Sequence, residues 1–159
     1  MTRLWTPLGI RLRPALLASI VIVAVPVAWS LNASAAAGAS AEPVMLATGQ
    51  FVDADSFHRG EGKVLLIRLP DGQRFIRFEN FKVTNGPDLY VYLSSHPAPR
   101  SSAQLHEGGA FEVARLKGNI GNQNYPLPVD LDLSKFKSVA IYCKRFRTMF
   151  SSAELTFRT

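Results

Sequence analysis

The chain has 159 residues, of which 10% are aromatic and 19% are charged, so it can form a packed core and does not have the composition of a disordered protein. This length accommodates one domain plus a targeting segment, but not two full domains. The formal net charge is +6, yet from Glu42 onward 15 Lys and Arg residues stand against 12 Asp and Glu residues. An excess of about +3 on the domain is too small to predict nucleic-acid binding.

Residues 1–41 have the pattern of an export segment. Arg11 and Arg13 precede an uncharged apolar run, residues 15–31, which is followed by small-residue stretches of the kind that signal peptidases accept. The run is slightly long for a signal sequence and short for a spanning helix, so cleavage and retention as an anchor both stay open. By the positive-inside rule, the positively charged flank is expected to stay in the cytoplasm, and the rest of the chain is then expected to cross the membrane. The sequence therefore predicts an exported protein on the periplasmic or extracellular side, either secreted or anchored by residues 15–31.

The rest of the chain is predicted to form a single β domain, residues 47–159. It contains short segments with apolar and polar residues in alternation, separated by Gly, Pro, Asn and Asp. The turn Pro70-Asp71-Gly72 predicts a hairpin between two of them. The pattern predicts an all-β fold, an antiparallel sandwich or small barrel of about eight short strands. The predicted strands are 50–52, 63–69, 74–78, 88–93, 111–116, 129–133, 138–143 and 153–157, and the long loops are 94–109 and 117–128.

Several motifs give this domain a family resemblance. His58 and Gly60 precede a strand, and the chain then reads ENF at 79–81, NGPDLYVYL at 85–93, LKGNIGNQNYPLP at 116–128 and VAIYCKRF at 139–146. Together these motifs resemble the DM-thirteen domain, a small extracytoplasmic β domain of bacteria and animals that often stands beside DOMON domains. The match runs from about Gly49 to Phe157. The family's glycine, aspartate and tyrosine positions fall on Gly86, Asp88, Gly121 and Tyr125.

The resemblance implies a role in electron transfer, which has been proposed for the family, with its single cysteine as a bare thiol or as a haem ligand. That cysteine falls on Cys143, the only cysteine of the chain, which can form no disulfide within it. The basic stretch Lys144–Arg147 follows directly and favours a reactive thiolate. The alternation of the strand instead places Cys143 on the face of Val139 and Ile141, as a buried core residue. Both interpretations stay open, and the exposure of the thiol distinguishes them.

Other side chains are weaker candidates. Any cofactor is unknown, but a haem would need an iron ligand and an apolar pocket, and His58 or Met149 could supply a second ligand beside Cys143. His58 could equally be a loop residue bonded to the backbone. The turn Gly86-Pro87-Asp88 is expected to be structural, with the Asp88 carboxylate accepting backbone N–H groups. There is no Cys-x-x-Cys-His motif, so covalent c-type haem attachment is excluded.

No catalytic set of residues stands at a recognisable spacing. The sequence has no zinc signature, no phosphate-binding glycine loop and no nucleophile elbow, so it predicts neither a metal site nor a classical enzyme. The first hypothesis is an exported redox module centred on Cys143, with a redox partner in the cell envelope. The alternative is a non-catalytic binding or structural module of the envelope in which Cys143 is a core residue.

Overall fold

The computed structural model describes residues 42–158. The predicted signal or anchor segment lies outside these residues. Within them, no helix is long and apolar enough to cross a membrane. The strands are β1 (Val44–Asp53), β2 (Gly60–Arg68), β3 (Arg74–Val83), β4 (Leu89–Ser94), β5 (Ala110–Arg115), β6 (Gln123–Leu127), β7 (Ser138–Cys143), β8 (Thr148–Glu154) and β9 (Thr156–Phe157), and the helices are α1 (Ser102–His106) and a 3-10 helix at Leu133–Lys135.

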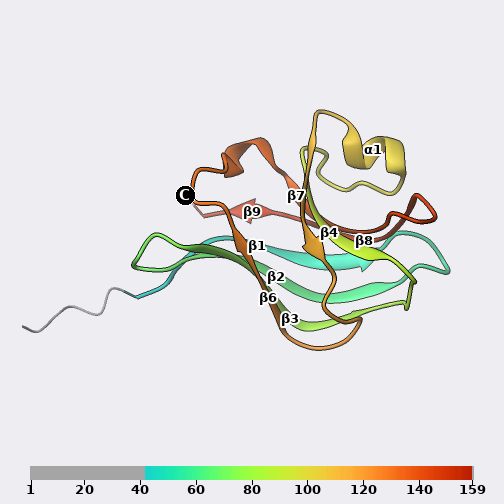
Figure 1. Cartoon of the computed structure of the whole chain (residues 1–159), viewed down its shortest axis with the longest axis horizontal. Coiled ribbons are helices and arrows are strands. Elements are labelled where there is room, and N and C mark those ends of the chain that lie inside the picture. Colours follow the sequence, from blue (N-terminus) through green and yellow to red (C-terminus); the bar gives the residue numbers. More distant parts are fainter. Residues whose placement is uncertain (1–41, 159) are drawn as a thin grey trace, which may run out of the picture. The chain divides into compact units, whose positions relative to one another are not determined.

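The strands form one antiparallel sheet that curls into a nearly closed barrel (Figure 1). The strand order is β5-β4-β7-β8-β1-β2-β3-β6. Outside this order, the short strand β9 pairs antiparallel with β1. The two edge strands, β5 and β6, approach each other, and between them the Lys117 N–H donates to the Tyr125 hydroxyl at 3.0 Å. The predicted all-β antiparallel fold is confirmed, and of the two architectures left open the barrel is the one observed.

Strand alternation divides the buried side chains into two groups. One group fills the barrel interior and includes, from β4 and β7, the side chains of Leu89, Val91, Leu93, Ile141 and Cys143. Large side chains from the other long strands of the barrel belong to the same group. The outward-facing group on β4 and β7 packs under α1, which covers this part of the sheet (Figure 1). That smaller cluster contains Ala54, Tyr92, Leu105, Ala140, Tyr142 and Met149. The predicted hairpin at Pro70–Gly72 is also confirmed, with Gly72 at φ +86°.

Several predictions about the later part of the chain are wrong in bounds or in kind. The strand predicted at 153–157 is instead the end of β8, which begins at Thr148, followed by the two-residue β9. Residues 129–133 are not a strand: Val129 is 69% exposed, and the Asp132 side chain caps the 3-10 helix by accepting the Ser134 N–H at 3.1 Å. Strand β6, which was not predicted, lies within the predicted loop 117–128. In it, Gln123, Tyr125 and Leu127 point inward. The other predicted loop, 94–109, contains α1, whose N-cap is Ser101.

Candidate functional site

Cys143 is the last residue of β7 and lies inside the barrel. Its exposed fraction is 0%, and on the neighbouring strand β4 it is paired with Leu89. The structure places it on the interior face with Val139 and Ile141, as the strand alternation predicts. Lys144, the first residue of the basic stretch that follows, turns away from the sulfur: its ammonium contacts Glu112 at 2.9 Å and lies over the Tyr90 ring. Arg145 and Arg147 are exposed. The thiol is thus a packed interior group.

The end of the barrel next to Cys143 is covered by apolar side chains. Phe150, on β8, is 4% exposed, and its ring lies 4.4 Å from the His58 ring, centroid to centroid. A Cβ added at Gly86 would stand 2.8 Å from Phe150 Cζ and 2.9 Å from Leu89 Cδ2. Gly86 therefore lets the two side chains close over this end, which explains why a glycine stands in the NGPD motif.

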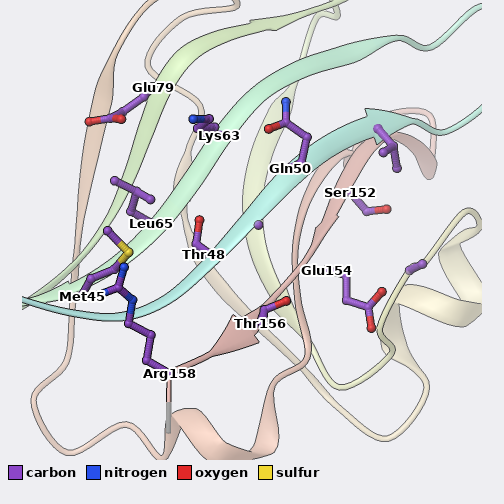
Figure 2. A pocket seen from close by; sticks show the side chains of 13 residues that line it. Met45, Thr48, Gln50, Lys63, Leu65, Glu79, Ser152, Glu154, Thr156 and Arg158 are labelled. Atoms are coloured by element: carbon purple, nitrogen blue, oxygen red, sulfur yellow. The ribbon is translucent and has the colours of Figure 1, made fainter.

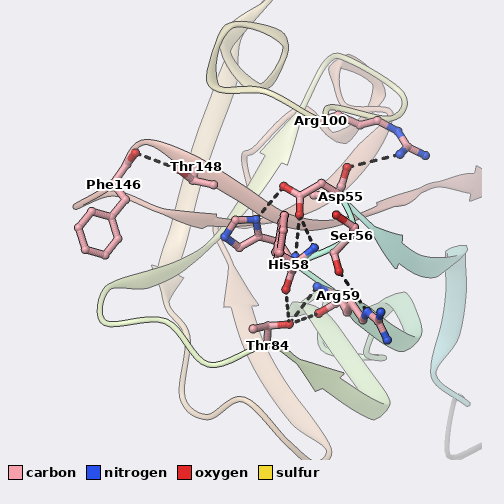
Figure 3. Close-up of polar contacts among 10 residues, drawn as sticks. Asp55, Ser56, His58, Arg59, Thr84, Arg100, Phe146 and Thr148 are labelled. Atoms are coloured by element: carbon pink, nitrogen blue, oxygen red, sulfur yellow. Dashed lines mark hydrogen bonds and ion pairs between the residues drawn. The ribbon is translucent and has the colours of Figure 1, made fainter.

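His58 and Asp55 form a polar pair at the surface of the same end (Figure 3). His58 Nδ1 lies 2.7 Å from Asp55 Oδ2, while Asp55 Oδ1 accepts the backbone N–H groups of Phe57 and His58, both at 2.8 Å. The hydrogen bond with the His58 side chain is the main cause that lowers the pKa of Asp55 from 3.8 to about 2, followed by the two backbone bonds. The pair fixes the β1–β2 loop and orients His58 over Phe150.

The pKa of Asp55 gives a direct test of this arrangement. We expect NMR titration of the full chain to give a value of about 2, and His58→Ala to raise it toward 3.8 because the side-chain hydrogen bond is lost. Since the folded-state pKa lies below the unfolded one, the ionised carboxylate stabilises the loop above pH 3.8, and this stabilisation disappears as the pH falls through 2. An unchanged pKa in His58→Ala would mean that the backbone bonds alone hold the carboxylate.

The remaining ligand candidates do not assemble around Cys143. Met149 is 1% exposed but belongs to the cluster under α1, on the opposite face of the sheet from Cys143. His58 is bonded to Asp55 and stacked on Phe150. The larger surface hollows of residues 42–158 are lined by other side chains. A haem does not fit at Cys143, since the sulfur lies in the packed core. Within the described residues, no group of three or more His, Cys, Asp or Glu side chains could hold a metal ion.

The family-motif residues have structural contacts. Lys144 N–H donates to the backbone carbonyl of Asp88 at 3.1 Å, and the Asp88 carboxylate lies 3.8 Å from Arg115, so the turn is tied through the backbone and not through the predicted side-chain bonds. Pro87 directly precedes Asp88 in this turn. In the loop before β6, Gly121 adopts φ +103°. Tyr125 is fully buried, and its hydroxyl donates to Gln123 Oε1. These residues hold loops to the barrel.

A tyrosine cluster lies on the outer face of β4 and β7. The Tyr92 hydroxyl donates to Glu112 Oε2 at 2.5 Å, and the Tyr142 ring centroid lies 5.8 Å from that of Tyr92. His106 packs edge-on against both rings. The alternation of residues 89–93 puts Tyr90 and Tyr92 on one face, but which side chain lies opposite each of them depends on the strand register, which the sequence does not show.

The surface of the barrel has two further features. An open hollow of about 720 Å³ runs over the outer face of β1 and β2 and is lined by side chains of both charges, among them Lys63, Glu79 and Arg158 (Figure 2). At the end of the barrel near Cys143, Phe57, Ile120 and Phe146 are 81%, 67% and 63% exposed. Each of the three loops that carry them is joined by a backbone hydrogen bond to residues 83–88: Thr84 N–H donates to Arg59, Val83 N–H to Asn119, and Lys144 N–H to Asp88.

These observations define a small antiparallel β barrel with one interior cysteine at its loop end and a tyrosine cluster on its flank. The chain belongs to the family described as Electron transfer DM13, whose model matches residues 50–155. The resemblance found in the sequence motifs is thereby confirmed. Neither the comparison with curated proteins nor that with solved structures gave a match.

Proposed function

We propose that this domain exchanges electrons with a partner in the cell envelope, on the far side of the membrane from the cytoplasm. Membership of a family described by electron transfer supports the reaction class. The cationic and apolar pattern of residues 1–41 supports export, with residues 15–31 cleaved off or retained as the anchor. The small charge excess of the domain argues for a protein partner and against nucleic acid.

Cys143 is the group that we assign to change oxidation state. Its burial excludes water and bulky reagents, but an electron can tunnel through packed protein without contact between donor and acceptor. In the oxidising step, an oxidised one-electron carrier takes one electron from the thiol, the S–H bond breaks, and a thiyl radical forms. No base is in contact with the sulfur, so the proton leaves to water when this end of the barrel, where His58 packs on Phe150, opens transiently.

The test is protein-film voltammetry of the full chain. We expect a one-electron wave that Cys143→Ala abolishes. The matched control is Val139→Ala, which trims another fully buried interior side chain of β7 and leaves the thiol in place. A wave that persists in Cys143→Ala would remove the cysteine from the proposal. A wild-type chain with no wave and no absorbance from a cofactor would remove electron transfer.

A second candidate function is a non-catalytic binding module, and the 0% exposure of Cys143 favours it. In this case the thiol is a core residue, and the exposed Phe57, Ile120 and Phe146, with basic neighbours such as Arg59 and Arg145, form the contact surface. The expected result is a colourless protein whose thiol reacts only after denaturation and which shows no voltammetric wave. A purified protein that cycles electrons would contradict this function.

A further inference from the structure

Proton balance is the difficulty of a redox role for the interior cysteine. Loss of an electron from a neutral thiol or phenol is favourable only when its proton can leave to a base, since the oxidised group becomes a strong acid. Cys143 is enclosed among apolar side chains, and among residues 42–158 no hydrogen bond joins its sulfur to an acceptor. A redox group with a base already in contact would avoid this cost.

Tyr92 has such a base. Its hydroxyl donates to Glu112 Oε2 at 2.5 Å, a distance typical of a charge-assisted O–H···O⁻ hydrogen bond. The Lys144 ammonium donates to the same carboxylate at 2.9 and 3.2 Å. These two donors lower the pKa of Glu112, so the carboxylate is ionised near neutral pH and ready to accept a proton. The pKa of Tyr92 is raised, by burial first and by Glu112 second, so the phenol keeps its proton until it is oxidised.

The surroundings of Tyr92 suit a route for electrons. Tyr92 is 6% exposed and Tyr142 4%, and their rings meet edge to face with centroids 5.8 Å apart. The Tyr142 hydroxyl is paired with Ser102 Oγ at 2.8 Å, and a serine is a poor base, so the radical should rest on Tyr92. Glu112 and Lys144 are each 41% exposed, so a partner docked on the β5 side would come close to the pair.

We propose that Tyr92, with Glu112 as its proton acceptor, is a redox site of this domain. An oxidised one-electron carrier takes an electron from the phenol, the O–H bond of Tyr92 breaks, and the proton moves to Glu112 Oε2. The products are a neutral tyrosyl radical, a protonated carboxyl group and the carrier reduced by one electron. Return of an electron and of the Glu112 proton restores the phenol. This inference rests on the proposed electron-transfer function and assigns it a second group besides Cys143.

The experiment oxidises the full chain with photogenerated tris(bipyridine)ruthenium(III) and traps the product for electron paramagnetic resonance. Ring-deuterated tyrosine identifies the tyrosyl signal and separates it from radicals of Trp5 and Trp29. We expect Tyr92→Phe to lose the signal. Tyr125→Phe should keep it, because the hydroxyl of that buried tyrosine donates to the amide of Gln123, a far weaker base than a carboxylate. Glu112→Gln should slow the oxidation about a hundredfold, the usual contribution of a positioned base.

The outcomes separate this inference from the cysteine proposal. A tyrosyl signal of wild-type yield in Tyr92→Phe, or an unchanged rate in Glu112→Gln, overturns the inference and leaves the voltammetric result for Cys143 untouched. A signal that is lost in Cys143→Ala and kept in Tyr92→Phe likewise overturns it, and supports the sulfur as the electron donor. A Cys143→Ala chain that keeps the radical, beside a Tyr92→Phe chain that loses it, supports the inference whether or not the voltammetric wave depends on Cys143.

Discussion

Gly62→Ala is expected to destabilise the domain by about 3–5 kcal/mol, a large share of the total stability of a domain of this size. Gly62 stands in β2 at φ +108°, a conformation that residues with a side chain rarely adopt. An added Cβ would stand 2.7 Å from both the Asn80 carbonyl oxygen and Phe81 Cα, and 2.8 Å from the Glu79 carbonyl oxygen. All three atoms belong to the β3 backbone, which cannot move without disrupting the β2–β3 pairing.

The measurement is urea unfolding followed by far-ultraviolet circular dichroism, with Gly72→Ala as the control. Gly72 also has a positive φ, +86°, but nothing lies within 4 Å of its added Cβ. That substitution should cost only the backbone strain, about 1–2 kcal/mol. Equal losses at the two positions would show that the close approach of β3 at Gly62 contributes nothing beyond backbone strain.

The sequence predicted the strands in which regular alternation and burial coincide. On β4 and β7 the interior faces follow the alternation, because each strand has apolar residues at every second position and lies between two neighbours in the sheet. The alternation at Val129–Leu133 had the same form but no neighbouring strand, and Asp132 instead capped a 3-10 helix. Strand β6 was not predicted because it contains Asn124 and Pro126, which in a sequence indicate a loop. An edge strand such as β6 tolerates both residues.

The candidate sites show a similar limit. The interior face of Cys143 followed from the strand alternation, whereas the Asx turn at Asp55, whose carboxylate accepts the backbone N–H groups of Phe57 and His58, was not predicted. The Tyr92–Glu112 pair could not be predicted, because the β4–β5 register shifts between Val91 and Tyr92. A one-residue slip reverses which side chains face each other, so such pairs become visible only in three dimensions.

Phe150→Ala is expected to open the end of the barrel beside Cys143. Removing a buried phenylalanine side chain costs about 3–5 kcal/mol, and the space that it leaves adjoins Leu89, Gly86 and His58. Because each 1.4 kcal/mol multiplies an open population tenfold, we expect the Cys143 thiol to react with a disulfide reagent about a hundredfold faster or more than in the wild type. The measurement is the reaction rate in the absence of denaturant.

Leu93→Ala separates local opening from global unfolding. Leu93 is a fully buried interior residue at the other end of β4, and its truncation should cost about 2–5 kcal/mol. Since Leu93 is paired with Val139 and not with Cys143, its loss should raise thiol reactivity only as far as the unfolded fraction rises. Equal acceleration in Leu93→Ala and Phe150→Ala, at equal stability loss, would mean that Phe150 is not the cover of the thiol.

The Phe150 variant also separates the two functions of Cys143. If electrons tunnel to a sulfur that stays enclosed, opening the end admits water and changes the potential of the voltammetric wave, because the stability of a thiolate or thiyl radical depends on the polarity around it. If Cys143 is only a core residue, the same opening raises its reactivity toward the reagent but introduces no wave. A change in potential therefore supports a redox thiol, whereas a thiol that becomes reactive without any wave supports Cys143 as a core residue.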